Sequence, residues 1–287
     1  MRAVNKIKDI TDLLSSRGLE SAGKEAELIL KHGLGIDTVK IYRDDPVLMD
    51  KEDDLISEIA ERRSMREPLQ YILGSEEFLG LKISVGEGVL IPRPETELLA
   101  EEAIKRLHTL QNKVDTKQLA ILDLCTGSGC IALAVAKEFK DADVCGVDIS
   151  DKAIAYAKNN SVMNGINNVI FIKGDLFEPI KEGRYFDLII SNPPYIKTSD
   201  IEGLQPEIRE WEPLSALDGG EDGLDFYKKI IPAARVFLND SGILIFELGD
   251  GCADEVVHIM KESGYINIET IKDYSGIERI VSAQWTR

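Results

Sequence analysis

Residues 121–132 read Ile-Leu-Asp-Leu-Cys-Thr-Gly-Ser-Gly-Cys-Ile-Ala and decide the fold class of this chain. The apolar run at residues 119–124 predicts a buried strand, and the apolar run from Cys130 to Phe139 predicts a helix. Glycines at such a strand-to-helix turn let the backbone approach a bound ligand closely. The turn has the form Asp-x-x-x-Gly-x-Gly, because Ala132 occupies the place of a third glycine. The stretch therefore predicts an α/β fold with a ligand bound at this turn.

An acidic residue ends the next predicted strand. Residues 144–147 are apolar, and Asp148 follows them, about 20 residues beyond the glycine turn. A carboxylate at this place is suited to accept hydrogen bonds from two ribose hydroxyls. A nucleoside-bearing cofactor is therefore expected, and NAD, a flavin and S-adenosylmethionine all agree with this pair of motifs.

A third signal is the run Asn192-Pro193-Pro194-Tyr195, which follows a strand predicted at residues 186–191. Two prolines remove two backbone donors and disfavour a helix, so the run predicts a stiff turn at the carboxyl edge of the sheet. The turn offers the Asn192 amide oxygen, the Pro193 carbonyl and the Tyr195 ring to a planar nitrogen that carries hydrogens. We predict that Asn192, Pro193 and Tyr195 are catalytic and that, with Pro194, they bind the substrate. An ordinary rigid strand exit is the alternative.

Together these motifs resemble the amino-methyltransferases that use S-adenosylmethionine, whose substrates are DNA bases or glutamines of ribosomal proteins and release factors. Three further stretches narrow the resemblance: residues 66–74 read Arg-Glu-Pro-Leu-Gln-Tyr-Ile-Leu-Gly, residues 91–97 read Ile-Pro-Arg-Pro-Glu-Thr-Glu, and residues 212–224 read Glu-Pro-Leu-Ser-Ala-Leu-Asp-Gly-Gly-Glu-Asp-Gly-Leu. From about residue 67 to the C-terminus, the chain resembles the peptide chain release factor N5-glutamine methyltransferases (the PrmC/HemK family). Residues 248–251, Leu-Gly-Asp-Gly, depart from the family pattern of Ile-Gly with a nearby Gln.

The resemblance implies methylation of the N5 side-chain amide of a glutamine, in a Gly-Gly-Gln type loop of a release factor, as part of translation termination. It implies S-adenosylmethionine as the cofactor and no metal. The expected cofactor contacts are Cys125, Thr126, Gly127, Ser128 and Gly129 for the methionine portion, Asp148 for the ribose, Asp175 and Phe177 for the adenine, and Asn192 near the reacting centre. A turn or cap role is the alternative for Asp175. Arg93, Glu95 and Thr96 are expected to close the pocket, or Glu95 and Thr96 serve only as first-turn helix residues.

The charge of the chain restricts its partners. There are 51 acidic and 34 basic residues, a net charge of −17. Proteins that bind duplex DNA gain affinity from clustered Lys and Arg, so direct DNA binding is disfavoured. The one basic run, at residues 61–66, is expected to be the solvated face of a helix. An acidic surface suits a cationic cofactor and a basic partner protein.

The cysteines and the hydropathy pattern indicate a compartment. The four cysteines form no Cys-x-x-Cys pair, which indicates a reducing environment and argues against structural zinc. We recognise no signal peptide and no apolar run of the ~20 residues that a membrane helix needs. We therefore expect a cytoplasmic protein without a membrane partner. Separately, we expect a monomer.

The chain is expected to divide into three parts. Apolar residues recur at helical spacing in at least three segments before Pro68, which predicts a helical substrate-binding domain at residues 1–75. A β-hairpin around Gly80 is expected to link it, over residues 76–92, to a methyltransferase domain at residues 93–287. That domain is expected to contain a seven-stranded, mostly parallel sheet. Its last strand should be antiparallel, because the turn at residues 273–276 is too short for a parallel crossover.

Three alternatives stay open at this point. A nucleic-acid adenine amino-methyltransferase uses the same Asn-Pro-Pro-Tyr run, although we find no basic target-recognition segment. A glutamine methyltransferase of a ribosomal protein shares the motifs. A regulatory protein that binds the cofactor without activity would be expected to have lost Asn192 or Asp148, and both are intact.

Overall fold

The computed structural model describes residues 1–111 and 118–286. The chain forms two compact units. The first comprises Met1–Gly74 together with the short segment Gln205–Trp211, and the second comprises Ser75–Leu204 and Glu212–Arg287. The sequence pattern does not predict that residues 205–211 belong with the helical unit. The range 93–287 of the predicted methyltransferase domain also includes residues 112–117 and 287, which lie outside the described residues.

The first unit is a bundle of short helices. They are α1 (Ala3–Ser16), α2 (Ala22–Leu34), α3 (Thr38–Asp44), α4 (Asp50–Ser64), α5 (Leu69–Leu73) and α9 (Pro206–Arg209). The apolar stripes of α1, α2 and α4 form its core, with Leu14, Ile29, Leu30 and Ile56 fully buried. This confirms the bundle predicted from helical spacing. Helices α3 and α5 are too short to give a periodic signal of their own.

The basic run at residues 61–66 is a solvated face only in part, and that expectation is wrong for Arg63, which is buried. The guanidinium of Arg63 is buried, and it donates to Glu25 at 2.6 Å and to Glu207 at 3.1 Å. Arg66 donates to the second oxygen of Glu207 at 3.2 Å. A buried guanidinium needs such partners, because an unpaired charge is costly away from water. Glu207 thereby anchors the segment Gln205–Trp211 to α4 and the loop after it.

The second unit alternates strands and helices. Its elements are β1 (Ser75–Phe78), β2 (Leu81–Ser84), α6 (Pro94–Gln111), β3 (Ala120–Leu124), α7 (Cys130–Glu138), β4 (Asp143–Asp148), α8 (Asp151–Met163), β5 (Val169–Lys173), β6 (Phe186–Ser191), the 3₁₀ turns Thr198–Gly203 and Leu214–Ala216, α10 (Asp225–Phe237), β7 (Leu238–Glu247), α11 (Ala253–Glu262), β8 (Ile266–Lys272) and β9 (Glu278–Gln284). The strands predicted at residues 119–124, 144–147 and 186–191, the helix predicted from Cys130 to Phe139 and the hairpin predicted around Gly80 all occur. At the start of β7, Leu238 pairs with Phe186 before a register shift.

The central sheet has seven strands in the order β5-β4-β3-β6-β7-β9-β8. Strands β3 to β7 run parallel to one another. The last strand, β9, lies between β7 and β8 and is antiparallel to both. This confirms the predicted mostly parallel sheet with an antiparallel final strand. The hairpin of β1 and β2 is a separate two-stranded sheet.

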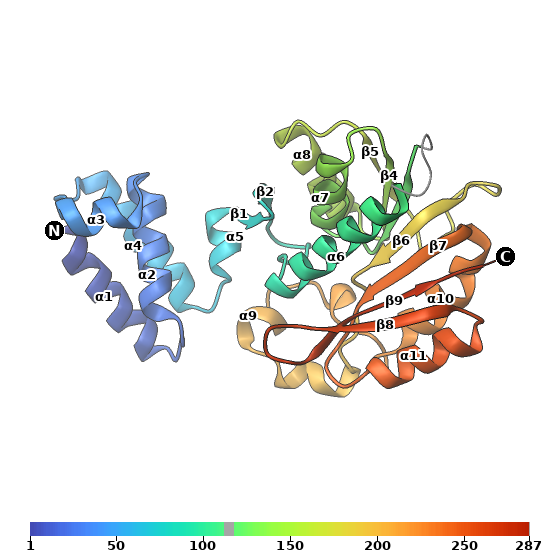
Figure 1. Ribbon diagram of the computed structural model, residues 1–287. Coiled ribbons are helices and arrows are strands. Elements are labelled where there is room, and N and C mark those ends of the chain that lie inside the picture. The colour runs from blue at the N-terminus through green and yellow to red at the C-terminus, as the bar shows by residue number, and fades with distance from the viewer. Residues whose placement is uncertain (112–117, 287) are drawn as a thin grey trace. The chain divides into compact units, whose positions relative to one another are not determined.

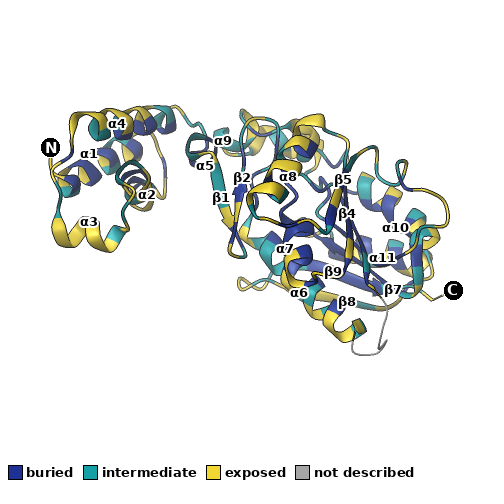
Figure 2. Cartoon of the chain, turned by 90° about the horizontal axis from the view of Figure 1, so that it is seen from above, coloured by how far each residue is buried: buried dark blue, intermediate teal, exposed yellow. Residues whose placement is uncertain are grey.

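Helices cover both faces of this sheet. Helices α6, α7 and α8 lie on one face, and α10 and α11 lie on the other (Figure 1). The inner strands β3, β4, β6 and β9 are mostly buried, whereas the edge strand β8 and the outer sides of the helices are largely exposed (Figure 2). The chain leaves β3 toward β4 on one side, and β6 lies on the other side of β3. Open α/β sheets bind ligands at such a switch point, at the carboxyl ends of the strands.

No helix within residues 1–111 or 118–286 combines the length and the apolar character needed to cross a membrane.

Candidate functional site

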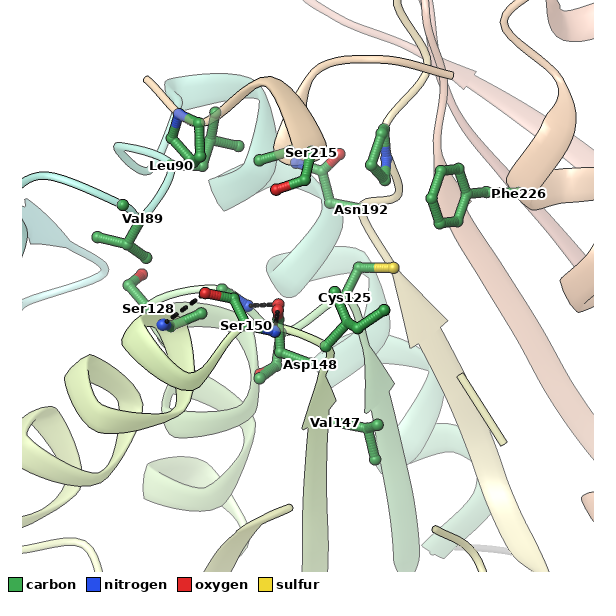
Figure 3. Close-up of a pocket in the computed structure, with 18 of the residues that line it drawn as sticks. Val89, Leu90, Cys125, Ser128, Val147, Asp148, Ser150, Asn192, Ser215 and Phe226 are labelled. Atoms are coloured by element: carbon green, nitrogen blue, oxygen red, sulfur yellow. Dashed lines mark hydrogen bonds between the residues drawn. The ribbon is translucent and has the colours of Figure 1, made fainter. Parts of the chain in front are cut away.

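A cavity of about 550 Å³ opens at the carboxyl ends of β3, β4 and β6 (Figure 3). This volume is in the range of sites for small molecules and cofactors. In the view of Figure 3, Asp148 and Ser150 lie on one side of the cavity and Asn192 and Ser215 on the other. All the residues that line the cavity belong to the second unit. The site therefore occupies the switch point that the sheet order creates.

The glycine turn after β3 is held from below by a buried carboxylate. Oδ2 of Asp123 accepts hydrogen bonds from the hydroxyl of Thr126 and from the backbone N–H of Ala132 at 3.2 Å. Asp123 is fully buried, and this desolvation raises its pKa to about 7. Cys125, the residue after β3, has a positive φ of 58°, so the chain turns sharply there. The first residue of the Asp-x-x-x-Gly-x-Gly pattern is thus the one that fixes the turn.

Asp148 ties β4 to the same turn. Its Oδ2 accepts from the backbone N–H of Gly127 at 2.8 Å, and its Oδ1 accepts from that of Ser150 at 2.9 Å. Burial raises the pKa of Asp148, while the backbone N–H groups around it act in the opposite direction. The backbone N–H of Ile149 also acts on this carboxylate. A carboxylate has about four lone-pair sites, so Asp148 keeps the capacity to accept a further hydrogen bond from a ligand.

Most of the predicted cofactor residues lie on the cavity. Those that line it are Cys125, Thr126, Gly127, Ser128, Asp148, Asp175 and Asn192. Gly129 is not among the lining residues, because its Cα faces the ring of Phe171 and the methyl group of Ala157. Phe177 is not among them either: its ring stacks on Phe237, with ring centroids 4.7 Å apart, and Leu176 lines the cavity in its place.

The Asn-Pro-Pro-Tyr run forms the end of the cavity beyond β6. Asn192 and Pro194 line it, Pro193 is buried, and the hydroxyl of Tyr195 points to Glu247. The motif at residues 212–224 packs directly on this run. A Cβ on Gly219 would lie 2.7 Å from Cα of Tyr195, and one on Gly223 would lie 2.5 Å from its carbonyl oxygen. These two glycines are needed because two backbone segments approach each other closely.

The Tyr195 ring rests on the loop that departs from the family pattern. A Cβ on Gly249 would lie 2.9 Å from Cδ2 of the ring. The absence of a side chain at Gly249 therefore makes room for Tyr195, and the Leu-Gly-Asp-Gly loop at residues 248–251 supports the Asn-Pro-Pro-Tyr turn.

Three polar groups connect Asn192 to the core of the sheet. Nδ2 of Asn192 donates to Oγ1 of Thr96 at 3.0 Å, and that hydroxyl donates to Oε2 of Glu247 at 2.7 Å. The hydroxyl of Tyr195 donates to Oε1 of Glu247 at 3.1 Å. Desolvation raises the pKa of Glu247 to about 7, and the hydrogen bonds from Thr96 and Tyr195 oppose this rise.

A second buried carboxylate positions the segment before α6. Glu212 accepts from the guanidinium of Arg93 and, at 3.2 Å, from the backbone N–H of Ile91. Burial raises the pKa of Glu212, and the charge of Arg93 counteracts it. The motifs at residues 91–97 and 212–224 therefore meet in space, and Pro92 and Pro213 both line the cavity.

Some lining residues are not found by the sequence analysis. They are Val89, Leu90, Ser215, Phe226 and Lys229, among others, and Figure 3 shows the first four around the rim. Glu247 is missed as well, because a strand end with one acidic residue has no distinctive spacing. For the other residues just named, the one signal in the sequence is that they lie within or close to the motifs at residues 91–97 and 212–224.

The described lining is acidic. Its charged side chains are three carboxylates, from Asp148, Asp175 and Asp218, and one ammonium group, from Lys229. Such a lining favours a cationic ligand and disfavours a polyanion. Within residues 1–111 and 118–286 there is no group of three or more His, Cys, Asp or Glu side chains placed to hold a metal ion.

Comparison with known proteins agrees with both units. Residues 115–283 match a family described as a methyltransferase domain, and residues 6–74 match the PrmC N-terminal domain. Among solved structures, a methyltransferase from Pyrococcus furiosus is similar in fold, with a TM-score of 0.50, 20% identity, and coverage of 72% of this chain and 90% of that one.

Curated relatives match over nearly the whole length. A release factor glutamine methyltransferase of Thermodesulfovibrio yellowstonii is 46% identical over 284 residues, which is 99% of this chain and 98% of the relative. One from Geobacter sulfurreducens is 45% identical, with 98% and 96% covered. The chain belongs to the release factor glutamine methyltransferase family.

Proposed function

We propose that this protein transfers a methyl group from S-adenosylmethionine to the side-chain amide nitrogen of a glutamine in a peptide chain release factor. The observation that carries the proposal is the state of Asn192. Its Nδ2 is held by Thr96, and among the described residues its Oδ1 has no hydrogen-bond partner. A fixed acceptor at the wall of the cavity is suited to take an N–H of a planar amide.

The cavity fits the cofactor in size and in charge. Three carboxylates and one ammonium group line it, which suits a sulfonium cation better than the pyrophosphate of NAD or of a flavin dinucleotide. We assign the ribose hydroxyls to Asp148, the methionine portion to the backbone from Cys125 to Ser128, and the adenine to the neighbourhood of Asp175 and Leu176. Phe177 has no part in this assignment, because it stacks on Phe237.

When bound, S-adenosylmethionine supplies an electrophilic methyl group, so the protein needs to supply orientation and electrostatics. A glutamine amide nitrogen is a poor nucleophile, because its lone pair is delocalised into the carbonyl. Oδ1 of Asn192 and the carbonyl of Pro193 accept its two hydrogens, and they stabilise the positive charge that develops on the nitrogen. Tyr195, held by Glu247, supports this turn from behind.

We also propose that the helical unit holds a separate region of the release factor. Large apolar side chains are exposed on it at Val39, Val47 and Met49, with 73%, 64% and 66% of their surface accessible. Contact at two points raises the effective concentration of the glutamine at the cavity. On this account the helical unit binds the release factor, the β1–β2 hairpin links the helical unit to the methyltransferase domain, and that domain catalyses the methyl transfer. A cytoplasmic, monomeric protein fits this role.

The experiment that tests the proposed function compares substrate classes. The purified protein is incubated with S-adenosylmethionine carrying a labelled methyl group and with a release factor, a ribosomal protein or duplex DNA. Label is expected on the release factor. Label on DNA alone would move the protein to the nucleic-acid alternative, and label on the ribosomal protein alone would move it to the other glutamine methyltransferases.

A further inference from the structure

Hydrogen bonds run from Asn192 to Thr96 and from Thr96 to Glu247. We call this buried chain the relay, and the donor and the acceptor of each bond are fixed. Thr96 is 3% exposed and Glu247 is 1% exposed, so water does not compete for their polar atoms. An ionised carboxylate only accepts hydrogen bonds, so the hydroxyls of Thr96 and Tyr195 must both donate to Glu247. The single proton of Thr96 is then used, and its oxygen offers only lone pairs to Asn192.

This direction decides which end of the Asn192 amide faces the cavity. The oxygen and the NH₂ group of an asparagine are similar in shape, so packing alone distinguishes them poorly. A lone pair on Oγ1 of Thr96 requires the NH₂ group on that side, at the observed distance of 3.0 Å. Oδ1 is thereby left to accept from another group.

We propose that Glu247 is a positioning residue of the methyl-transfer site, which through Thr96 fixes the Asn192 amide with its oxygen available to the substrate. This inference rests on the proposed function, because it takes Oδ1 of Asn192 as the acceptor of the glutamine amide. Glu247 touches neither the substrate nor the cofactor in this account, and it acts only by setting the direction of the relay.

The protonation of Glu247 should reverse the relay. A protonated carboxyl gains a donor, and if it donates to Thr96, the Thr96 hydroxyl is released to donate to Oδ1 of Asn192. The pKa of Glu247 is about 7, because it is buried. The charged groups that face it are Glu95, which raises this pKa, and Arg279, which lowers it. The acidic groups of Tyr195, Tyr227 and Cys130 also lie near it, and their own pKa values are raised, so they stay neutral near pH 7.

The first test replaces Glu247 by a near-isosteric amide. Glu247→Gln places an NH₂ group that can donate to Thr96 at every pH. The Thr96 hydroxyl can then donate to Asn192, so the orientation of the Asn192 amide is no longer fixed. Turnover at pH 8 should fall by about 10- to 100-fold, as for a misplaced catalytic group. The wild-type turnover should fall as the pH is lowered through about 7, and the variant should lack this dependence. Affinity for S-adenosylhomocysteine should stay the same.

Two controls separate this role from general effects. Glu102 on α6 is also largely buried, and it pairs with Arg106 and Lys105 outside the cavity. The control variant Glu102→Gln neutralises this carboxylate and should leave turnover and its pH profile unchanged. Asp123 also has a pKa of about 7. If the pH dependence persists in Glu247→Gln, it belongs to Asp123 and the inference fails.

The second test acts on the middle of the relay. Thr96→Val keeps the shape and removes the hydroxyl, and it should lower turnover by about 10- to 100-fold. Thr96→Ser restores the hydroxyl and should recover most of the lost turnover. If serine and valine are equally impaired, the methyl group of Thr96 matters rather than its hydrogen bonds, and the relay is not the cause.

A third readout needs no activity. In the free wild-type protein, the side-chain amide resonance of Asn192 in ¹⁵N NMR should shift between pH 6 and pH 8, and this shift should be absent in Glu247→Gln. An Asn192 resonance that ignores pH in the wild type would overturn the inference. Failure of the proposed function looks different, since the wild type itself would then leave the release factor unmethylated while the resonance still shifts.

The stability of Glu247→Gln shows whether lost turnover is lost structure. The folded pKa of Glu247 is raised, so its ionisation costs folding free energy. The contribution of the Glu247 carboxyl to the stability of the folded protein is greatest below its unfolded pKa of about 4.3, and it is lost as the pH rises through the folded pKa of about 7. The glutamine variant avoids that cost. Its midpoint of urea unfolding at pH 8 should be equal to or above that of the wild type. A much lower midpoint would mean that the variant loses turnover because it unfolds. The inference would then be tested by the Asn192 resonance of the wild type and by the two Thr96 variants.

Discussion

Oδ2 of Asp148 accepts a hydrogen bond from the backbone N–H of Gly127 at 2.8 Å, so the end of β4 is fastened to the turn that follows β3. The residue proposed to hold the ribose is therefore also part of the turn proposed to hold the methionine portion. Changes at Asp148 should act on both parts of the cofactor together.

Asp148→Ala should weaken cofactor binding strongly. It removes a charged acceptor from the proposed ribose hydroxyls and releases the backbone N–H of Gly127 in the glycine turn and that of Ser150 after β4. One hydrogen bond to a charged group contributes about 1.5–3 kcal/mol, which corresponds to roughly 10- to 100-fold in affinity. Calorimetry with S-adenosylhomocysteine measures this. An unchanged dissociation constant would mean that the ribose is bound elsewhere.

Asn192→Ala should affect the transfer step more than binding. The loss of one preorganised electrostatic contact lowers turnover by about 10²–10³-fold in comparable sites. Affinity for S-adenosylhomocysteine should change much less, since Asp148 and the glycine turn are intact. Single-turnover rates at saturating cofactor provide the measurement. Wild-type rates in the variant would remove Asn192 from the mechanism.

Much of this site could be predicted from the sequence because its signals are local. The glycine turn and the Asn-Pro-Pro-Tyr run each consist of consecutive residues whose backbone preferences decide their conformation, and both lie at the cavity. The pairing of Thr96 with Glu247 joins residues 151 positions apart, and that of Arg63 with Glu207 joins residues 144 apart. No spacing rule connects such positions, and only the completed sheet and bundle bring them together.

Phe177 shows a different limit. A strand exit places Asp175, Leu176 and Phe177 near the cavity, but which of their side chains points inward depends on the turn. Leu176 has a positive φ of 48° and takes the inward place, while Phe177 packs on Phe237. The local sequence pattern indicates that this segment lies at the cavity, whereas the side chain that lines the cavity depends on the conformation of the turn.

Gly129→Ala should destabilise the second unit more than Gly165→Ala does. Both glycines have positive φ, 80° and 66°, so an alanine costs about 1–2 kcal/mol of backbone strain at either place. At Gly129 the new Cβ would also lie 2.8 Å from the Phe171 ring, whereas at Gly165 nothing lies within 4 Å. Overpacking adds about 1–3 kcal/mol. Urea unfolding compares the two variants, and equal losses would show that Phe171 moves aside freely.

The helical unit should matter for the intact release factor and not for a short glutamine peptide. Val39→Asp combined with Met49→Asp places charges on its exposed apolar side chains. The loss of about 1 kcal/mol of contact should raise the KM for the intact factor about 5-fold or more. Val236→Asp is the matched control, since Val236 is 66% exposed on α10 of the other unit. If the peptide and the intact factor are affected alike, the helical unit does not contact the partner through these residues.

The central claim is that the cavity beside Asn192 methylates the side-chain nitrogen of a glutamine in a release factor, and fragment mass spectrometry tests it most directly. The release factor is incubated with the protein and S-adenosylmethionine carrying a deuterated methyl group, then digested and fragmented. The account predicts one label, on the side-chain nitrogen of a single glutamine, and its near absence with Asn192→Ala. A label on another residue type, or one that persists in Asn192→Ala at the wild-type rate, would contradict it.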